Sequence, residues 1–167
     1  MDYLIPSLAE LLLPFACCFR VEVFATFRTV CAAWLLCPGP RTLTEVWQAT
    51  GLAARRHIDL IYSLFRSAVW DWDELGLILA LSILSRLVPY GLVWIVVDDT
   101  LCHKRGAKVA FGGIFLDAVL SSKRRKLLRF GLNWVVLGIA VRLPCRSDRC
   151  FCLPVLWRVF HKKGLPG

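Results

Sequence analysis

The sequence predicts an α+β fold, in which a helical N-terminal part is followed by β-strands. Through most of the first 88 residues, apolar residues recur three and four positions apart, which is the period of a helix packed on one face. From Gly91 onward, runs of β-branched and aromatic residues bounded by glycine and proline replace this period, as is typical of strands. We therefore predict a helical domain over residues 1–88 and a strand-rich domain over residues 89–167.

Five helical segments are expected in the first part. They cover Leu8–Cys18, Glu22–Leu36, a stretch from Thr42 to near Gly51, Arg55–Ser67, and a stretch that begins at Asp71 or Asp73 and ends before Pro89. Thr42, followed three residues later by Glu45, has the pattern of a helix-capping box. The two short helices around Gly51, the second opened by Arg55 and Arg56, fit either a DNA-binding helix-turn-helix or an ordinary bundle whose arginines face solvent.

Three buried strands are expected in the second part, namely Val93–Val97, Asn133–Leu143 and Cys150–Phe160. Pro154 in the last of them indicates an edge strand or a bulge. Residues 101–131 are predicted to be rich in loops and carry eight Lys and Arg. Because three strands without a covering helix leave an apolar sheet face exposed, we expect the chain to stop partway through a domain.

The charge of the chain is distributed unevenly. Residues 1–99 hold seven Arg and no Lys against ten Asp and Glu, whereas residues 100–167 hold fourteen Lys and Arg against two Asp. This asymmetry indicates a polyanionic partner for the second half, nucleic acid more readily than a membrane surface. The alternative is a basic face that only keeps the protein soluble.

A hydrophobic content of 57% also raises the alternative of a small basic membrane protein. The longest uncharged runs, Thr29–Pro40 and Phe130–Val141, have twelve residues each, and a spanning helix needs about 18 or more. We therefore predict no membrane partner and a cytoplasmic location. The eight cysteines include no C-x-x-C pair, so the sequence predicts small buried residues rather than a zinc site.

Two adjacent carboxylates, Asp98 and Asp99, end the first expected strand and precede Thr100. Carboxylates held rigidly by a sheet suit Mg²⁺, which prefers oxygen ligands. Neighbouring residues of a strand point to opposite faces, so only one of the two can face a given metal site. The alternative is that these residues form only a turn or a helix cap.

Four motifs, "VVDDTLCHKRGAKVAFGG", "DAVLSS", "GLNWVVL" and "LPVLWRVFHKKG", occur in this order over residues 96–164. Together with the upstream "WLLCPGPRTLTEVWQATGL", this pattern resembles the DDE superfamily endonucleases, the transposases of bacterial insertion sequences. The resemblance covers residues 20–164 and implies an RNase H-like core, of which this chain holds the first three strands.

The resemblance also implies metal-dependent cleavage and transfer of DNA strands by three acidic residues with Mg²⁺ or Mn²⁺. It makes Asp99 the catalytic metal ligand and Asp98 its neighbour. It implies DNA element ends as the partner, a second copy or a full-length transposase as a further partner, and a location at the bacterial nucleoid. The implied phosphate contacts are Lys104, Lys108, Lys123, Arg124, Arg125, Lys126 and Arg129.

The sequence departs from the family pattern at two expected histidines and at the later acids. Leu132 stands in the G-H-N-W element, and Leu116 stands before the Asp-Ala pair. After Leu101 the only acids are Asp117 and Asp148. We therefore expect a truncated transposase that binds DNA without cutting it. The alternative is a short non-enzymatic regulator that competes with the full-length transposase at element ends.

Overall fold

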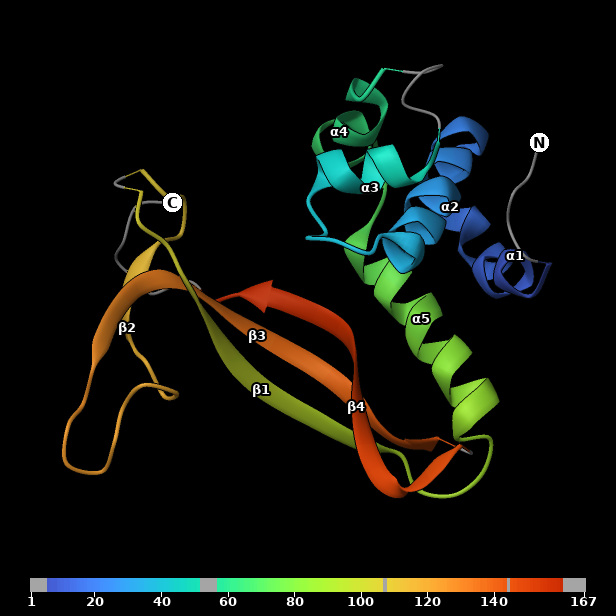
Figure 1. Ribbon diagram of the computed structural model, residues 1–167. Coiled ribbons are helices and arrows are strands. Elements are labelled where there is room, and N and C mark those ends of the chain that lie inside the picture. Colours follow the sequence, from blue (N-terminus) through green and yellow to red (C-terminus); the bar gives the residue numbers. More distant parts are fainter. Residues whose placement is uncertain (1–5, 52–56, 107, 144, 161–167) are drawn as a thin grey trace. The chain divides into compact units, whose positions relative to one another are not determined.

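Helices precede an antiparallel β-sheet in the computed structural model, which describes residues 6–51, 57–106, 108–143 and 145–160 (Figure 1). The chain is therefore α+β, as the sequence predicts. It divides into two compact units, Met1–Leu79 and Ala80–Gly167. The division falls inside the last helix, and the predicted domain boundary after residue 88 stays a prediction.

The helical unit is built around one small core. Its helical elements are α1 (Pro6–Leu12), the 3-10 helix η1 (Leu13–Cys18), α2 (Val21–Leu36), α3 (Leu43–Ala49), α4 (Asp59–Arg66) and the first part of α5 (Trp72–Leu87). The buried residues of the core are Val30, Ala33, Cys37, Val46, Trp47, Ile61 and Leu64. They come from α2, α3, α4 and the residue after α2, which explains the helical period of the sequence.

Local signals in the sequence place the starts of two helices correctly. The Thr42 hydroxyl caps α3 by accepting a hydrogen bond from the Glu45 backbone N–H, and it also donates to the Glu45 carboxylate at 3.3 Å. Asp71 precedes α5 and accepts from the Asp73 N–H at 2.6 Å. The helix predicted over Arg55–Ser67 begins at Asp59, and Arg55 and Arg56 lie outside the described residues.

The sheet is arranged around one long central strand. Its members are β1 (Trp94–His103), β2 (Gly113–Leu116), β3 (Leu128–Leu143) and β4 (Arg146–Val159). β3 pairs antiparallel with β1 along one edge and with β4 and β2 along the other. Gly131 of β3 lies opposite both His103 and Gly113, so the end of β1 and the start of β2 flank β3 at the same end of the sheet.

Pairing with β3 corrects three expectations about the strands. β1 does not end at Val97 but continues to His103, and β3 begins at Leu128 instead of Asn133. The short strand β2 lies in the stretch predicted to be rich in loops, so the described residues form four strands instead of three. The prediction for Pro154 is confirmed, because β4 pairs with β3 alone among the described strands and its register shifts beside this proline.

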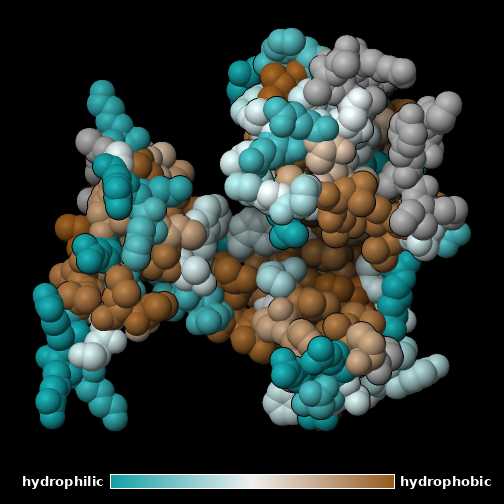
Figure 2. Space-filling view, viewed as in Figure 1, coloured by the Kyte–Doolittle hydropathy of each residue, from teal (hydrophilic) through white to brown (hydrophobic). Residues whose placement is uncertain are grey.

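Much of the sheet surface is apolar and exposed. Trp94, Ile95 and Val97 of β1 are 69%, 61% and 63% exposed, so the prediction of a buried first strand is wrong. Hydrophobic residues gather over the sheet in Figure 2, as an uncovered apolar face predicts. None of the helices in the described ranges is long and apolar enough to cross a membrane.

Candidate metal and nucleic-acid site

Asp98 and Asp99 lie in the middle of β1, not at its end. In the register with β3, Asp99 faces Val135 and Asp98 faces Val136. Directly opposed residues of an antiparallel pair share a face of the sheet, and successive residues alternate between faces. The two carboxylates therefore project from opposite faces, so only one of them can serve a site on either face.

Asn133 of β3 is the polar neighbour of Asp99. Its side-chain Nδ2 donates to Asp99 Oδ2 at 3.1 Å, whereas its Oδ1 is buried and has no hydrogen-bond partner among the residues that the structure describes. A buried carbonyl oxygen without a hydrogen-bond partner costs free energy, and a cation or a water molecule that binds to it would remove this cost. Within the described part of the chain, the Asp98 side chain makes a local contact, in which its Oδ1 accepts from the Asp99 N–H at 2.9 Å.

Asp99 and Asn133 together offer oxygen donors of the kind that Mg²⁺ and Mn²⁺ prefer. Rotation of the Asn133 amide would turn its carbonyl oxygen toward Asp99, an arrangement that a cation between the two oxygens would stabilise. With the amide turned in this way, the two side chains would supply two oxygen ligands to one divalent ion. Asp99 is not part of any cluster of three His, Cys, Asp or Glu side chains within the described ranges.

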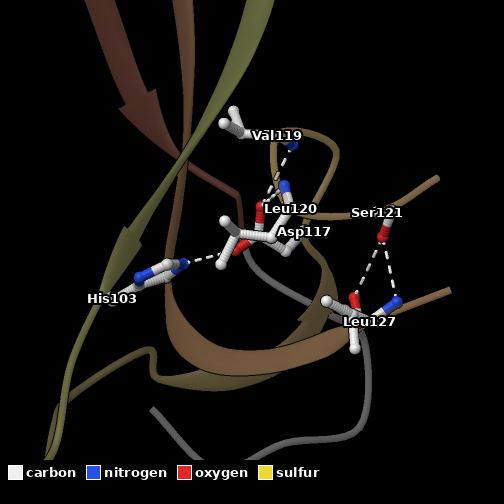
Figure 3. Close-up of polar contacts among 6 residues, drawn as sticks. All are labelled: His103, Asp117, Val119, Leu120, Ser121 and Leu127. Atoms are coloured by element: carbon white, nitrogen blue, oxygen red, sulfur yellow. Dashed lines mark hydrogen bonds and ion pairs between the residues drawn. The ribbon is translucent and has the colours of Figure 1, made fainter. Parts of the chain in front are cut away.

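The other two acids of the sheet unit have partners elsewhere. Asp148 lies in β4 and contacts Arg149 at 3.6 Å. Asp117 follows β2 and is only 2% exposed. Asp117 Oδ2 lies 2.6 Å from Nε2 of His103, the last residue of β1 (Figure 3). Neither acid forms a metal cluster with Asp99 among the described residues.

The buried carboxylate of Asp117 is held by three donors. Its Oδ1 accepts from the backbone N–H groups of Leu120 at 2.9 Å and Val119 at 3.0 Å. The N–H of Leu120 lowers the pKa of Asp117 most, and His103 and the N–H of Val119 lower it further, although burial acts in the opposite direction. The ionised form is favoured because these contacts all stabilise negative charge.

Ser121 and Ser122 continue this turn into the basic loop between β2 and β3. Ser121 Oγ accepts from the Leu127 N–H at 2.9 Å (Figure 3). The Ser122 N–H donates to the Arg125 carbonyl at 2.9 Å, and the Arg125 N–H donates to Ser122 Oγ at 3.1 Å. The Asp-Ala-x-x-Ser-Ser motif therefore builds the base of a turn that carries Lys123 and Arg124.

All seven predicted phosphate contacts are exposed, namely Lys104, Lys108, Lys123, Arg124, Arg125, Lys126 and Arg129. Four of them are consecutive in the β2–β3 loop. Lys104 follows His103 directly, and its N–H donates to the Phe130 carbonyl at 3.1 Å. Arg129 lies opposite Phe115 in the β2–β3 pair. The strand pairing thus brings Lys104, Arg129 and the basic loop to the end of the sheet at which β2 pairs with β3.

Two residues of this site were not assigned a role from the sequence. His103 is half exposed, at 51% for its side chain, and it joins β1 to the basic loop through Asp117. Asn133 contacts Asp99 across 34 positions of sequence. Neither contact has a local signal, because both depend on strand register.

Comparison with known proteins identifies a family. A family model described as DDE superfamily endonuclease matches residues 14–164. No curated protein matches the chain, and no solved structure does.

Proposed function

Because this chain belongs to the DDE superfamily endonucleases, we propose that it binds the DNA ends of an insertion sequence through its basic sheet end and does not cut DNA by itself. The family is one of transposase-like nucleases that act on DNA and generally use divalent metals. The observation that carries the proposal is the clustering of exposed Lys and Arg at one end of the sheet. Basic side chains bind DNA by neutralising phosphates and releasing counterions.

Asp99 and Asn133 would hold one Mg²⁺ or Mn²⁺ ion in this proposal. When bound, such an ion supplies positive charge that stabilises the oxygens of a phosphodiester during displacement. Asp99 contributes the charged ligand, and the buried Oδ1 of Asn133 gains a partner. Two-metal chemistry needs ligands from several directions, and within the described residues Asp99 belongs to no cluster of three ligand-type side chains. For lack of these further ligands, the chain would bind DNA without cleaving it.

The same observation favours a second function, a regulator that competes with the full-length transposase at element ends. Such a protein needs DNA affinity but no complete metal site. Both functions place the chain at the bacterial nucleoid. They differ in outcome, because a regulator lowers the strand transfer by the full-length enzyme when both are mixed with DNA carrying the element ends.

The test of DNA binding is a titration of the full chain with duplex DNA at several salt concentrations. The variant Lys123→Ala, Arg124→Ala, Arg125→Ala removes three charges from the basic loop. The matched control, Arg142→Ala, Arg146→Ala, Arg149→Ala, removes three exposed charges around the β3–β4 turn, where Leu143 pairs with Arg146. Each phosphate contact contributes about 0.9 to the slope of log K against log salt.

We expect the loop variant to bind more weakly and to lose up to about 3 from this slope, while the control keeps the slope of the wild type. Equal losses in the two variants would contradict binding through the basic loop. Nicking of plasmid DNA by the wild type in Mg²⁺ or Mn²⁺, absent in Asp99→Ala, would contradict the proposed lack of cleavage.

A further inference from the structure

Two adjacent cysteines and a glutamate converge in the helical unit, far from the basic loop in sequence. Cys17 and Cys18 end η1, and Glu74 lies in the first turn of α5. The two sulfur atoms and a carboxylate oxygen all lie within 4.8 Å of one another. Among the residues that the structure describes, this is the one group of three side chains of metal-ligating type.

The short 3-10 helix η1 places both cysteines. Pro14 lies at its start, and the Cys17 thiol donates to the Pro14 carbonyl at 3.3 Å. Cys18 is only 6% exposed, whereas Cys17 is exposed. The cluster thus has one sulfur anchored inside the unit and one at its surface, where an ion can enter from solvent.

Aromatic packing fixes the end of η1 against the start of α5. The ring of Phe19 lies 5.6 Å from that of Trp70, and Trp70 lies 4.2 Å from Trp72, the first residue of α5. Phe19 also stacks on Phe27 of α2 at 4.7 Å. Because these contacts hold the backbone on both sides of the cluster, the ligands are arranged before any ion binds.

The donor set suits Zn²⁺. Zinc binds thiolates at about 2.3 Å and carboxylate oxygens at about 2.0–2.2 Å in a tetrahedron, which places neighbouring ligands roughly 3.5–3.8 Å apart. The observed separations, within 4.8 Å, need only small rotations of the side chains to reach that geometry. The exposed side of the cluster leaves the fourth position to a water molecule.

The Cys18 thiol holds its proton tightly in the absence of an ion. Its pKa is raised to about 11, first by burial and then by its neighbours Cys17, Glu74 and Asp71. An ion that binds here therefore displaces this proton, and its affinity depends on pH.

From this geometry we infer that Cys17, Cys18 and Glu74 form a Zn²⁺ site that joins η1 to α5. The site is independent of the proposed DNA binding. A search of the sequence for C-x-x-C pairs does not find this site, because the cysteines are adjacent and the third ligand comes from a distant helix.

The expectation that most cysteines are buried is wrong, because Cys17, Cys102, Cys145, Cys150 and Cys152 are exposed.

The experiment is a titration of the full, reduced, metal-free chain with Co²⁺, which reports thiolate ligands by its absorption, followed by displacement with Zn²⁺. The variants are Cys17→Ser, Cys18→Ser and Glu74→Gln. The control is Cys150→Ser, Cys152→Ser, which removes two exposed and closely spaced thiols of the sheet unit. Circular dichroism establishes that each variant is folded.

We expect one Co²⁺ per chain with a thiolate absorption band that Zn²⁺ removes, and the same band in the control. Cys17→Ser and Cys18→Ser should lose most of the band. Because loss of an outer-shell partner alone weakens metal binding roughly 10–100-fold, loss of the ligand Glu74 should weaken it at least as much.

Three results would overturn the inference: no thiolate band in the wild type, a band that disappears in the Cys150→Ser, Cys152→Ser control, or full binding by Glu74→Gln. Cys17 and Glu74 are both exposed, so their variants decide the question even if Cys18→Ser does not fold. Alkylation of the thiols with and without Zn²⁺ adds a second readout, in which protection is expected at Cys17 and Cys18 and not at Cys102.

Discussion

His103 and Asp117 join the end of β1 to the turn after β2 through a contact of 2.6 Å between Nε2 and Oδ2. The histidine is half exposed, whereas the carboxylate is buried. Because the same carboxylate accepts two backbone N–H groups, it fixes the shape of the turn from which the basic loop starts. The position of the basic loop therefore depends on the Asp117 side chain, which is not itself basic.

The first prediction concerns the stability of the chain at low pH. The pKa of Asp117 is lowered in the folded chain, so its contribution to stability is present above the ordinary pKa of Asp and is lost as the pH falls through the lower folded value. We expect Asp117→Asn to reduce the loss of stability between about pH 5 and pH 2, measured by urea unfolding. The exposed Asp148→Asn is the control, and equal acid sensitivity in wild type and Asp117→Asn would contradict the role of Asp117.

The second prediction concerns the close approach of β1 and β3. A Cβ atom added to Gly131 would clash with the Cys102 carbonyl oxygen and lie 3.2 Å from the His103 Cα, so the backbone would have to move. We expect Gly131→Ala to lower the free energy of unfolding by about 1–3 kcal/mol, as overpacking does. Gly106→Ala, whose Cβ would meet the Val109 side chain at 3.4 Å and no other described residue within 4 Å, should change it little in the same denaturation experiment.

The third prediction concerns the cap of α3. Thr42 accepts from the Glu45 N–H, and α3 carries Val46 and Trp47 into the helical core. Thr42→Ala should destabilise the helical unit by about 1 kcal/mol, seen as a lower midpoint of thermal unfolding. Thr42→Ser keeps the hydroxyl and should recover most of the loss. Equal effects of the two substitutions would mean that the cap does not stabilise this helix.

The fourth prediction separates the two adjacent aspartates. Asp99 contacts Asn133 and Asp98 does not, so Asp99→Asn should weaken the binding of Mn²⁺ by roughly tenfold, equivalent to about 1.4 kcal/mol. Asp98→Asn should leave it near the value of the wild type. Relaxation of water protons by Mn²⁺ measures both affinities without any DNA cleavage, and an effect confined to Asp98→Asn would assign the ion to the other face.

The features predicted well from sequence are those set by neighbouring residues. The period of apolar residues places the helices, and Thr42 with Glu45 marks the start of α3. The features missed depend on pairing between distant segments. Asp98 and Asp99 have low strand propensity, yet they stay in β1 because both pair with residues of β3. Likewise, His103 meets Asp117 only after the strand register has formed.

The exposed strand β1 has one further consequence. It pairs with β3 alone among the described strands, so its outer edge presents backbone donors and acceptors to any other extended chain. The exposed apolar residues of β1 favour such pairing. If two copies paired antiparallel around the middle of β1, however, the carboxylates of Asp98 and Asp99 from the two copies would lie next to each other. Like charges opposed across strands are unfavourable. We therefore expect Asp98 and the proposed metal ligand Asp99 to disfavour pairing of the chain with a second copy along this edge.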